Sequence, residues 1–173
     1  MKTDRKNIIL QSLAAMLEEK NMSKITTASL AEKSNITEAA LYRHFPSKRS
    51  IYAELFSFCD DTIFAKCNEL KKEKISAQEK VKKIFIFFML FIEKNKGFAR
   101  LLSREALSSA EQNVSDNVNQ FYERFELVLR QMLKEDEKNL TTQAGISAQL
   151  IITVLEGNIG RYIRSKFKDS PST

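Results

Sequence analysis

The sequence predicts an all-α protein, and three observations support this fold class. The 173 residues include only two prolines and four glycines, so few positions interrupt helices. No segment alternates polar and apolar residues between turn-forming residues, as a half-buried strand would. Apolar residues instead recur at helical spacing, and at 43 % of the chain they are numerous enough to form a sizeable core. We expect eight helices in two domains, 1–47 and 48–173.

Three short helices are predicted in the first domain. Residues 4–20 place their apolar side chains on one helical face, which consists of Ile9, Leu13, Met16 and Leu17. Thr26 and Thr27 then offer a hydroxyl to cap a second helix over residues 28–33. The turn that follows contains Asn35, a residue type that tolerates the left-handed conformation which such turns often need.

The third helix covers residues 38–44, with Thr37 as its cap, and ends at Pro46, which cannot continue a helix. Leu41 and Phe45 are four residues apart, so both are expected to face the core.

Five longer helices are predicted in the second domain. Ser47 caps a helix that runs to about residue 72, and Ser76 with Glu79 forms a capping box that opens the next. Residues 84–92 are apolar all round, so this fifth helix is expected to run through the middle of the domain. Later helices are expected at about 98–110, 114–134 and 143–168.

The distribution of charge suggests a polyanionic partner. The chain has a formal net charge of +6, and residues 1–50 carry nine basic against five acidic residues. Cys59 and Cys67 lie about 12 Å apart along one helix, too far for a disulfide, so buried thiols of a reducing cytoplasm are expected. No signal-peptide core is evident, and the longest apolar run is too short to cross a bilayer.

The second and third helices have the length and spacing of a helix-turn-helix, whose second helix enters the DNA major groove. Ala39, Tyr42 and Arg43 share the face opposite Leu41 and are expected to point outward. Consecutive alanines allow the helix backbone to sit deep in a groove about 12 Å wide. The candidate DNA-contacting residues are Arg5, Lys6, Thr26, Thr27, Thr37, Glu38, Ala39, Tyr42, Arg43, His44 and Lys48.

Neither a metal site nor catalysis is expected. His44 is the only histidine, and no further histidine or cysteine pair completes a metal site around it. No nucleophile accompanies it either, so neither an enzyme nor a bound cofactor is predicted.

The arrangement of Ile25 to Ala28, Leu30-Ala31 and Glu38 to Lys48 resembles the N-terminal domain of TetR-family regulators. The resemblance implies a three-helix DNA-binding domain followed by a five-helix dimerisation and regulatory domain. Further segments are similar to the nucleoid occlusion factors of this family, namely residues 9–14 with 16–17, Phe91, Glu93, Asn95, Gly97 and the segments 119–126, 129–131 and 161–168.

This second resemblance implies a homodimer that binds palindromic chromosomal sites as paired dimers. When bound to DNA, it would engage the C-terminal tail of the division protein FtsZ and oppose Z-ring assembly. The family's tail-binding groove lies between the fourth and fifth helices. The matching positions are Phe58, Lys66, Phe87, Leu90, Lys94 and Asn95.

Departures at three of these positions affect this carry-over, because lysine stands at 66 and 94 where arginine is usual, and Leu90 replaces a small residue. The alternative is a ligand-responsive repressor with a partly polar cavity among its fourth to seventh helices. The bulky residues of 84–92 favour a filled core instead.

Overall fold

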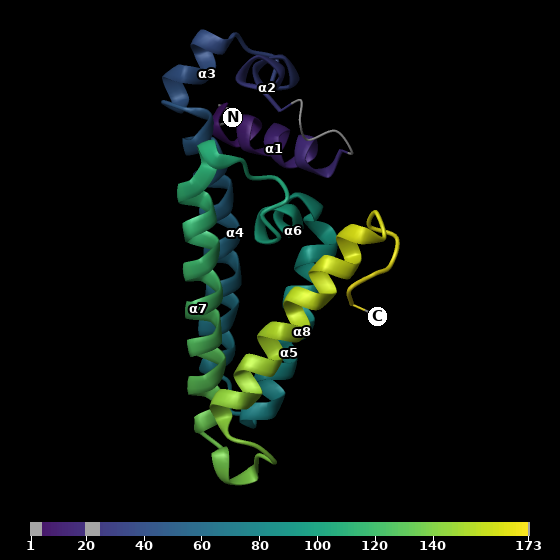
Figure 1. Cartoon of the computed structure of the whole chain (residues 1–173). Helices are drawn as coiled ribbons and strands as arrows, with labels where there is room; N and C mark the ends of the chain where they lie inside the picture. Colours follow the sequence, from purple (N-terminus) through teal and green to yellow (C-terminus); the bar gives the residue numbers. More distant parts are fainter. Residues whose placement is uncertain (1–4, 20–24, 173) are drawn as a thin grey trace. The chain divides into compact units, whose positions relative to one another are not determined.

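The computed structural model describes residues 5–19 and 25–172, and every regular element in these ranges is helical (Figure 1). The α-helices are α1 (Arg5–Glu18), α2 (Thr27–Lys33), α3 (Glu38–His44), α4 (Lys48–Lys71), α5 (Ala77–Lys94), α6 (Lys96–Leu102), α7 (Gln112–Lys134) and α8 (Ala144–Arg164). Two short 3-10 helices, η2 (Ser109–Glu111) and η3 (Glu137–Asn139), precede α7 and α8. The predicted all-α fold is therefore confirmed.

The chain divides into two compact units. The first consists of the residues up to Cys59 together with Asn95–Asp116, and the second of Asp60–Lys94 and Asn117–Thr173. The long helices α4 and α7 contribute to both. This division differs from the expected domains 1–47 and 48–173, whose boundary lies at the first residue of α4. The domain boundary stays a prediction.

Local signals set the limits of α2 and α3. The Thr26 hydroxyl accepts a hydrogen bond from the Ser29 backbone N–H at 3.1 Å, and Thr37 accepts one from Ala40 at 3.2 Å. Between the helices, Asn35 adopts the left-handed conformation with φ of 54°. Both predicted caps and the predicted turn are confirmed. They satisfy N–H groups that have no partner within a helix.

In the first unit, α6 packs closely against α1. A Cβ added at Gly97 would lie 3.0 Å from the Ala14 carbonyl oxygen and 3.0 Å from the Leu17 Cβ, so any side chain here would have to displace its neighbours by a few tenths of an ångström. Arg100, which is almost fully buried, donates to the carbonyl oxygen of Leu17 at 2.6 Å and also to that of Glu19. The guanidinium of α6 thus satisfies carbonyls left open at the end of α1.

The prediction for the sixth helix was wrong in its extent. In place of a helix over 98–110, α6 ends at Leu102 and Arg104 takes a left-handed conformation with φ of 61°. A capping box between Ser108 and Glu111 then opens η2, which leads directly into α7. The signature Ser-x-x-Glu was present in the sequence and marks a helix start.

The eighth helix also ends earlier than predicted, at Arg164 rather than about residue 168. Lys166 and Phe167 both have positive φ, and the Phe167 N–H bonds back to the Tyr162 carbonyl at 2.9 Å. The chain therefore leaves the helix through left-handed residues, a common way to satisfy the last carbonyls.

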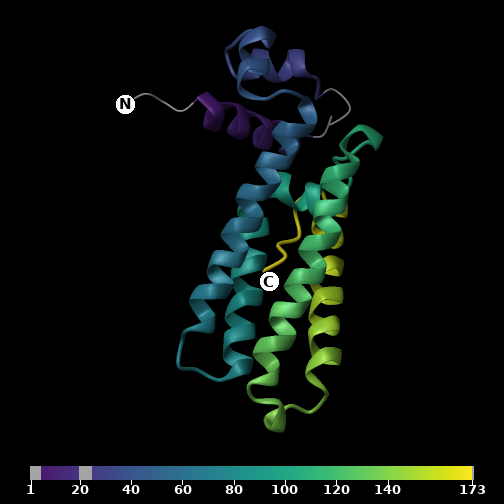
Figure 2. The same cartoon turned by 90° about the vertical axis from the view of Figure 1, so that its left-hand side faces the viewer.

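An aromatic cluster forms the core of the second unit. Phe88 of α5 packs against Phe125 of α7, with ring centroids 5.4 Å apart. Phe121 joins both rings, and Phe64 of α4 meets Phe121 edge-on at 5.7 Å. Helix α5 contacts α8, where Asn158 lies 3.9 Å from the sulfur of Met89. Figure 2 shows the α4–α5 and α7–α8 connections at the same end of this unit.

The prediction that residues 84–92 run through the middle of the domain was wrong for one face of α5. Ile84, Phe88, Met89 and Ile92 are buried, whereas Ile86 and Leu90 are 45 % and 44 % exposed. An all-apolar sequence does not reveal which face lacks a neighbour within the chain.

A second exposed apolar surface lies on α8. Ile146, Leu150 and Val154 recur every four residues and are 50 %, 57 % and 50 % exposed. On α7, Leu127 is 42 % exposed. We call the α8 set the α8 stripe. Large side chains exposed at helical spacing are typical of helices that pack against a partner.

Both cysteines are buried free thiols, as predicted. Burial raises the pKa of the Cys67 thiol to about 12, so the group is protonated at neutral pH. Of the helices in the described ranges, none combines the length and the hydropathy that crossing a bilayer requires.

Candidate functional site

Helix α3 presents a polar face to solvent. Glu38, Ala39 and Arg43 are exposed and Tyr42 is 48 % exposed, while Leu41 and Phe45 are buried beneath them. Leu41 and Phe45 fix the rotation of a helix that has only seven residues and would be unstable alone. The outward face expected from the sequence is therefore in place.

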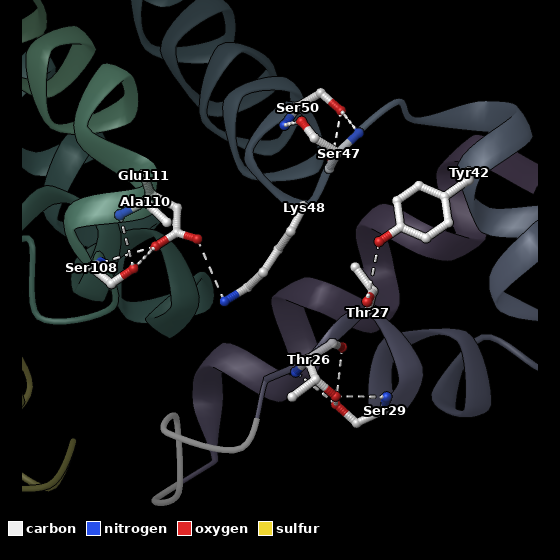
Figure 3. Close-up of polar contacts among 10 residues, drawn as sticks. All are labelled: Thr26, Thr27, Ser29, Tyr42, Ser47, Lys48, Ser50, Ser108, Ala110 and Glu111. Atoms are coloured by element: carbon white, nitrogen blue, oxygen red, sulfur yellow. Dashed lines mark hydrogen bonds and ion pairs between the residues drawn. The ribbon is translucent and has the colours of Figure 1, made fainter.

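A contact joins the two helices of the motif. The Tyr42 hydroxyl lies 3.5 Å from the Thr27 hydroxyl oxygen, so the tyrosine is held over the start of α2 (Figure 3). The Thr26 hydroxyl is engaged in its capping box, in which it bonds the Ser29 hydroxyl at 3.1 Å. Thr26 and Thr27 thus keep their predicted places at a helix N-terminus, with hydroxyls that already serve local contacts.

The start of α4 lies close to this face. Ser47 and Ser50 bond one another reciprocally, since each backbone N–H donates to the other's hydroxyl, at 3.2 and 3.1 Å. Ser47 is therefore the predicted cap. The next residue, Lys48, places its ammonium 3.5 Å from a Glu111 carboxylate oxygen and 5.2 Å from the Tyr52 ring centre.

The remaining basic candidates have different surroundings. Lys6 pairs with Glu54 at 3.7 Å and lies 5.2 Å from the centre of the Phe45 ring. Arg5 is exposed at the first turn of α1, and His44 is half-buried at the last residue of α3. Over residues 5–19 and 25–172, no three His, Cys, Asp or Glu side chains gather in a way that could hold a metal ion.

Sequence reasoning missed Glu111. Its carboxylate is almost fully buried at the start of α7 and accepts hydrogen bonds from both the hydroxyl and the N–H of Ser108. Burial by itself raises the pKa of Glu111, but the Ser108 bonds and the Lys48 charge outweigh it and lower the pKa. Burial raises the pKa of Tyr52, and the negative charge of Glu111 adds to this effect.

Four of the predicted partner-binding residues lie in the second unit. The Lys66 ammonium lies 6.0 Å from the Phe87 ring centre and pairs with Glu69 at 2.7 Å. Leu90 is part of the exposed face of α5, and Lys94 is exposed at its end. Ile86, which sequence reasoning missed, extends the same exposed face by one turn.

The other two, Phe58 and Asn95, lie in the first unit. Phe58 is 64 % exposed, an unusual state for a phenylalanine, and with Asn95 it lines a pocket of about 340 Å³. The pocket's remaining walls come from α1, α4 and α6, namely Asn7, Leu10, Gln11, Ala14, Glu18, Leu55, Cys59, Gly97 and Phe98.

Comparison with known families matches two segments of the chain. Residues 9–55 match the family described as bacterial regulatory proteins, tetR family, and residues 76–173 match tetracyclin repressor-like, C-terminal domain. With the helix-turn-helix, these matches define a DNA-binding regulator of the TetR type, a class without enzymatic activity. The nucleoid occlusion factor SlmA of Vibrio campbellii is 37 % identical over 99 % of this chain and 90 % of its own. The chain belongs to the SlmA family of nucleoid occlusion factors.

Other relatives agree with this membership. SlmA of a Marinomonas species is 36 % identical over 98 % of this chain and 88 % of its own. Among solved structures, the fatty acid degradation regulator FadR of Bacillus halodurans superposes with a TM-score of 0.81, at 14 % identity over 99 % of this chain and 90 % of that one. The regulator from Aquifex aeolicus has a TM-score of 0.73 at 20 % identity, covering 97 % of this chain and 92 % of that one. These structures support the fold alone.

Proposed function

We propose that this chain is a nucleoid occlusion factor, which binds palindromic chromosomal sites and, when bound, engages the C-terminal tail of FtsZ to oppose Z-ring assembly. The observation that carries the proposal is the 37 % identity to SlmA across 99 % of the chain. The proposal implies that the protein lies in the cytoplasm, associated with the nucleoid.

For DNA, the proposal assigns base contacts to the exposed face of α3 and phosphate contacts to the residues around it. Ala39 gives the backbone close access to the groove, and Arg43 can donate to base edges. Tyr42, Lys48, Lys6 and Arg5 are assigned to phosphates. Contacts of this second kind raise affinity on all sequences and make it depend on salt.

The test of the phosphate assignment is a binding titration with two unrelated duplexes. Tyr42→Ala and Lys48→Ala should weaken binding to both duplexes, and Lys48→Ala should lower the log–log salt slope by roughly 0.9. Lys138→Ala, which removes the same charge from the other compact unit, is the matched control. If both Tyr42→Ala and Lys48→Ala bind DNA with unchanged affinity, the assignment of these residues to phosphate contacts is wrong.

For the FtsZ tail, support comes from exposed apolar groups with lysines beside them. Leu90 and Phe58 are large, exposed and apolar, and Lys66 and Lys94 supply positive charge in the same helices. Side chains of these kinds suit a short peptide with apolar and acidic residues. The pocket beside Phe58 and Asn95 has room for one apolar side chain of that peptide.

A peptide of the FtsZ tail should bind the wild type, and Phe58→Ala or Lys94→Asp should abolish this binding while DNA binding survives. Lys134→Asp, an exposed lysine at the end of α7, controls for the change in net charge. The measurement is fluorescence anisotropy of the labelled peptide with and without duplex DNA. A wild type that binds the peptide no better than the variants would end the division role.

We further propose that the α8 stripe forms the dimer interface. One seven-residue reading helix contacts few base pairs, and a two-fold dimer matches a palindrome. Leu150→Asp should convert dimers into monomers in light scattering after size exclusion, while Gln149→Asp, its exposed neighbour, should not. A Leu150→Asp dimer as stable as the wild type would place the interface elsewhere.

The ligand-responsive alternative requires a cavity among α4 to α7. The pocket of about 340 Å³ takes its lining from α1, α4 and the start of α6, and no residue from α5 or α7. Phe58 and Asn95 belong both to this pocket and to the proposed peptide site. We therefore assign the pocket to peptide binding.

A further inference from the structure

An ion pair joins the start of α4 to the start of α7. Lys48 is the first residue of α4, and Glu111 is the last residue of η2, 63 positions later. The ammonium and the nearer carboxylate oxygen are 3.5 Å apart, and both residues belong to the first compact unit (Figure 3). The lysine side chain is 33 % exposed and the glutamate side chain 3 %.

The carboxylate of this pair is fixed in place. One of its oxygens accepts hydrogen bonds from the Ser108 N–H at 3.0 Å and from the Ser108 hydroxyl. The other oxygen faces Lys48. Because the turn that leads into α7 holds Glu111 at both its backbone and its side chain, the carboxylate cannot follow the lysine when the lysine moves.

Two groups compete for the Lys48 ammonium, namely the Glu111 carboxylate and the proposed DNA phosphate. A buried carboxylate is costly without a nearby cation, and Lys48 supplies that charge. The same lysine lies next to Ser47 at the end of the reading motif, where we assign it to a DNA phosphate. To reach a phosphate, the flexible side chain must give up part of its contact with Glu111, because the carboxylate stays in the turn.

We propose that Glu111 restrains Lys48 in the DNA-free protein and thereby lowers affinity for DNA, so that DNA binding is coupled to the turn between α6 and α7. This inference rests on the proposed phosphate contact of Lys48. The coupling is reciprocal by linkage, because the free energy that DNA binding removes from the ion pair is also lost from the stability of the Ser108–Glu111 turn. DNA remains the partner, while the Ser108–Glu111 turn, which lies outside the helix-turn-helix, adjusts the affinity for it.

The first test is Glu111→Gln. The amide oxygen can still accept from Ser108, whereas the negative charge beside Lys48 is gone. Binding to duplex DNA should tighten about three- to ten-fold, the effect of releasing one partly buried ion pair. Glu105→Gln is the matched control, since it removes one charge from the same connection at a residue that pairs with Arg100 at 3.9 Å instead. Equal tightening by both variants would overturn the restraint.

Lys48→Met separates this inference from the proposed function. If Lys48→Met binds DNA as tightly as the wild type and with the same salt slope, the phosphate contact itself fails. If Lys48→Met weakens binding and Glu111→Gln behaves like Glu105→Gln, only the restraint fails. The expected result is that Lys48→Met weakens binding and cancels the gain when combined with Glu111→Gln.

A measurement on the wild type avoids any loss of folding in the variants. Amide hydrogen exchange at Ala110 and Glu111 should become faster at saturating DNA, because the turn loses part of its lysine contact. The same amides in Lys48→Met should not respond to DNA. Slower or unchanged exchange in the wild type would overturn the inference.

Discussion

Replacing Gly97 with alanine should destabilise the protein, although alanine is the better helix former. The added Cβ would meet the Ala14 carbonyl oxygen and the Leu17 Cβ at 3.0 Å each, closer than ordinary van der Waals contact. One of these neighbours is backbone and cannot rotate away. Overpacking of this kind costs about 1–3 kcal/mol, against a gain of at most about 1 kcal/mol from helix propensity. We expect a net loss of up to about 2 kcal/mol.

Gly145→Ala is a position-matched control. Gly97 and Gly145 are both the second residue of their helices, α6 and α8, but a Cβ at Gly145 meets only the Arg130 Cδ at 3.7 Å. This variant should be neutral or slightly stabilising. Urea denaturation followed by circular dichroism gives both free energies of unfolding. A Gly97→Ala protein as stable as Gly145→Ala would refute the close packing of α6 on α1.

Three further predictions concern the first unit and the two thiols. Leu41→Ala removes a side chain with 0 % exposure, so it should cost about 2–5 kcal/mol in urea denaturation and abolish DNA binding; a cost below about 1 kcal/mol would contradict its role as anchor. Because the folded pKa of Glu111 lies below its ordinary 4.5, its stabilising contribution is complete above that value and is lost as pH falls through the folded pKa; melting temperatures should therefore fall less steeply in acid for Glu111→Gln, and parallel profiles would count against it. Cys67, unlike Cys59, which lines the pocket, should react with a thiol reagent at neutral pH only after unfolding in guanidinium, and rapid reaction of both thiols in the native protein would show that Cys67 is accessible.

The features that the sequence predicted well depend on neighbours along the chain. Thr37 caps α3 through a backbone N–H three residues away, and Asn35 needs only its own backbone conformation to form the turn. Leu41 and Phe45 follow the helical period. Such signals need no knowledge of the tertiary structure. This is why the helix-turn-helix and the outward face of α3 could be predicted residue by residue.

The features it predicted poorly depend on what lies across the fold or outside the chain. The contact between Lys48 and Glu111 spans 63 positions, and no local pattern pairs those two residues. The exposure of Ile86 and Leu90 could not be deduced, because a run that is apolar all round fits burial on every side equally well. The predicted extent of α6 was wrong because apolar residues before Ser108 continue a helical pattern past Leu102, whereas the Ser108–Glu111 capping signature starts a new helix.

Arg100 has a consequence for how the chain is made. The last carbonyls of α1 accept their hydrogen bonds from a residue 81 to 83 positions later in the sequence. During synthesis, α1 to α3 leave the ribosome before Arg100 is added to the chain. The carbonyls at the end of α1 therefore lack this donor until α6 has formed. An N-terminal fragment that stops before residue 100 should therefore fray at the end of α1 and should not reproduce the reading motif at its full stability.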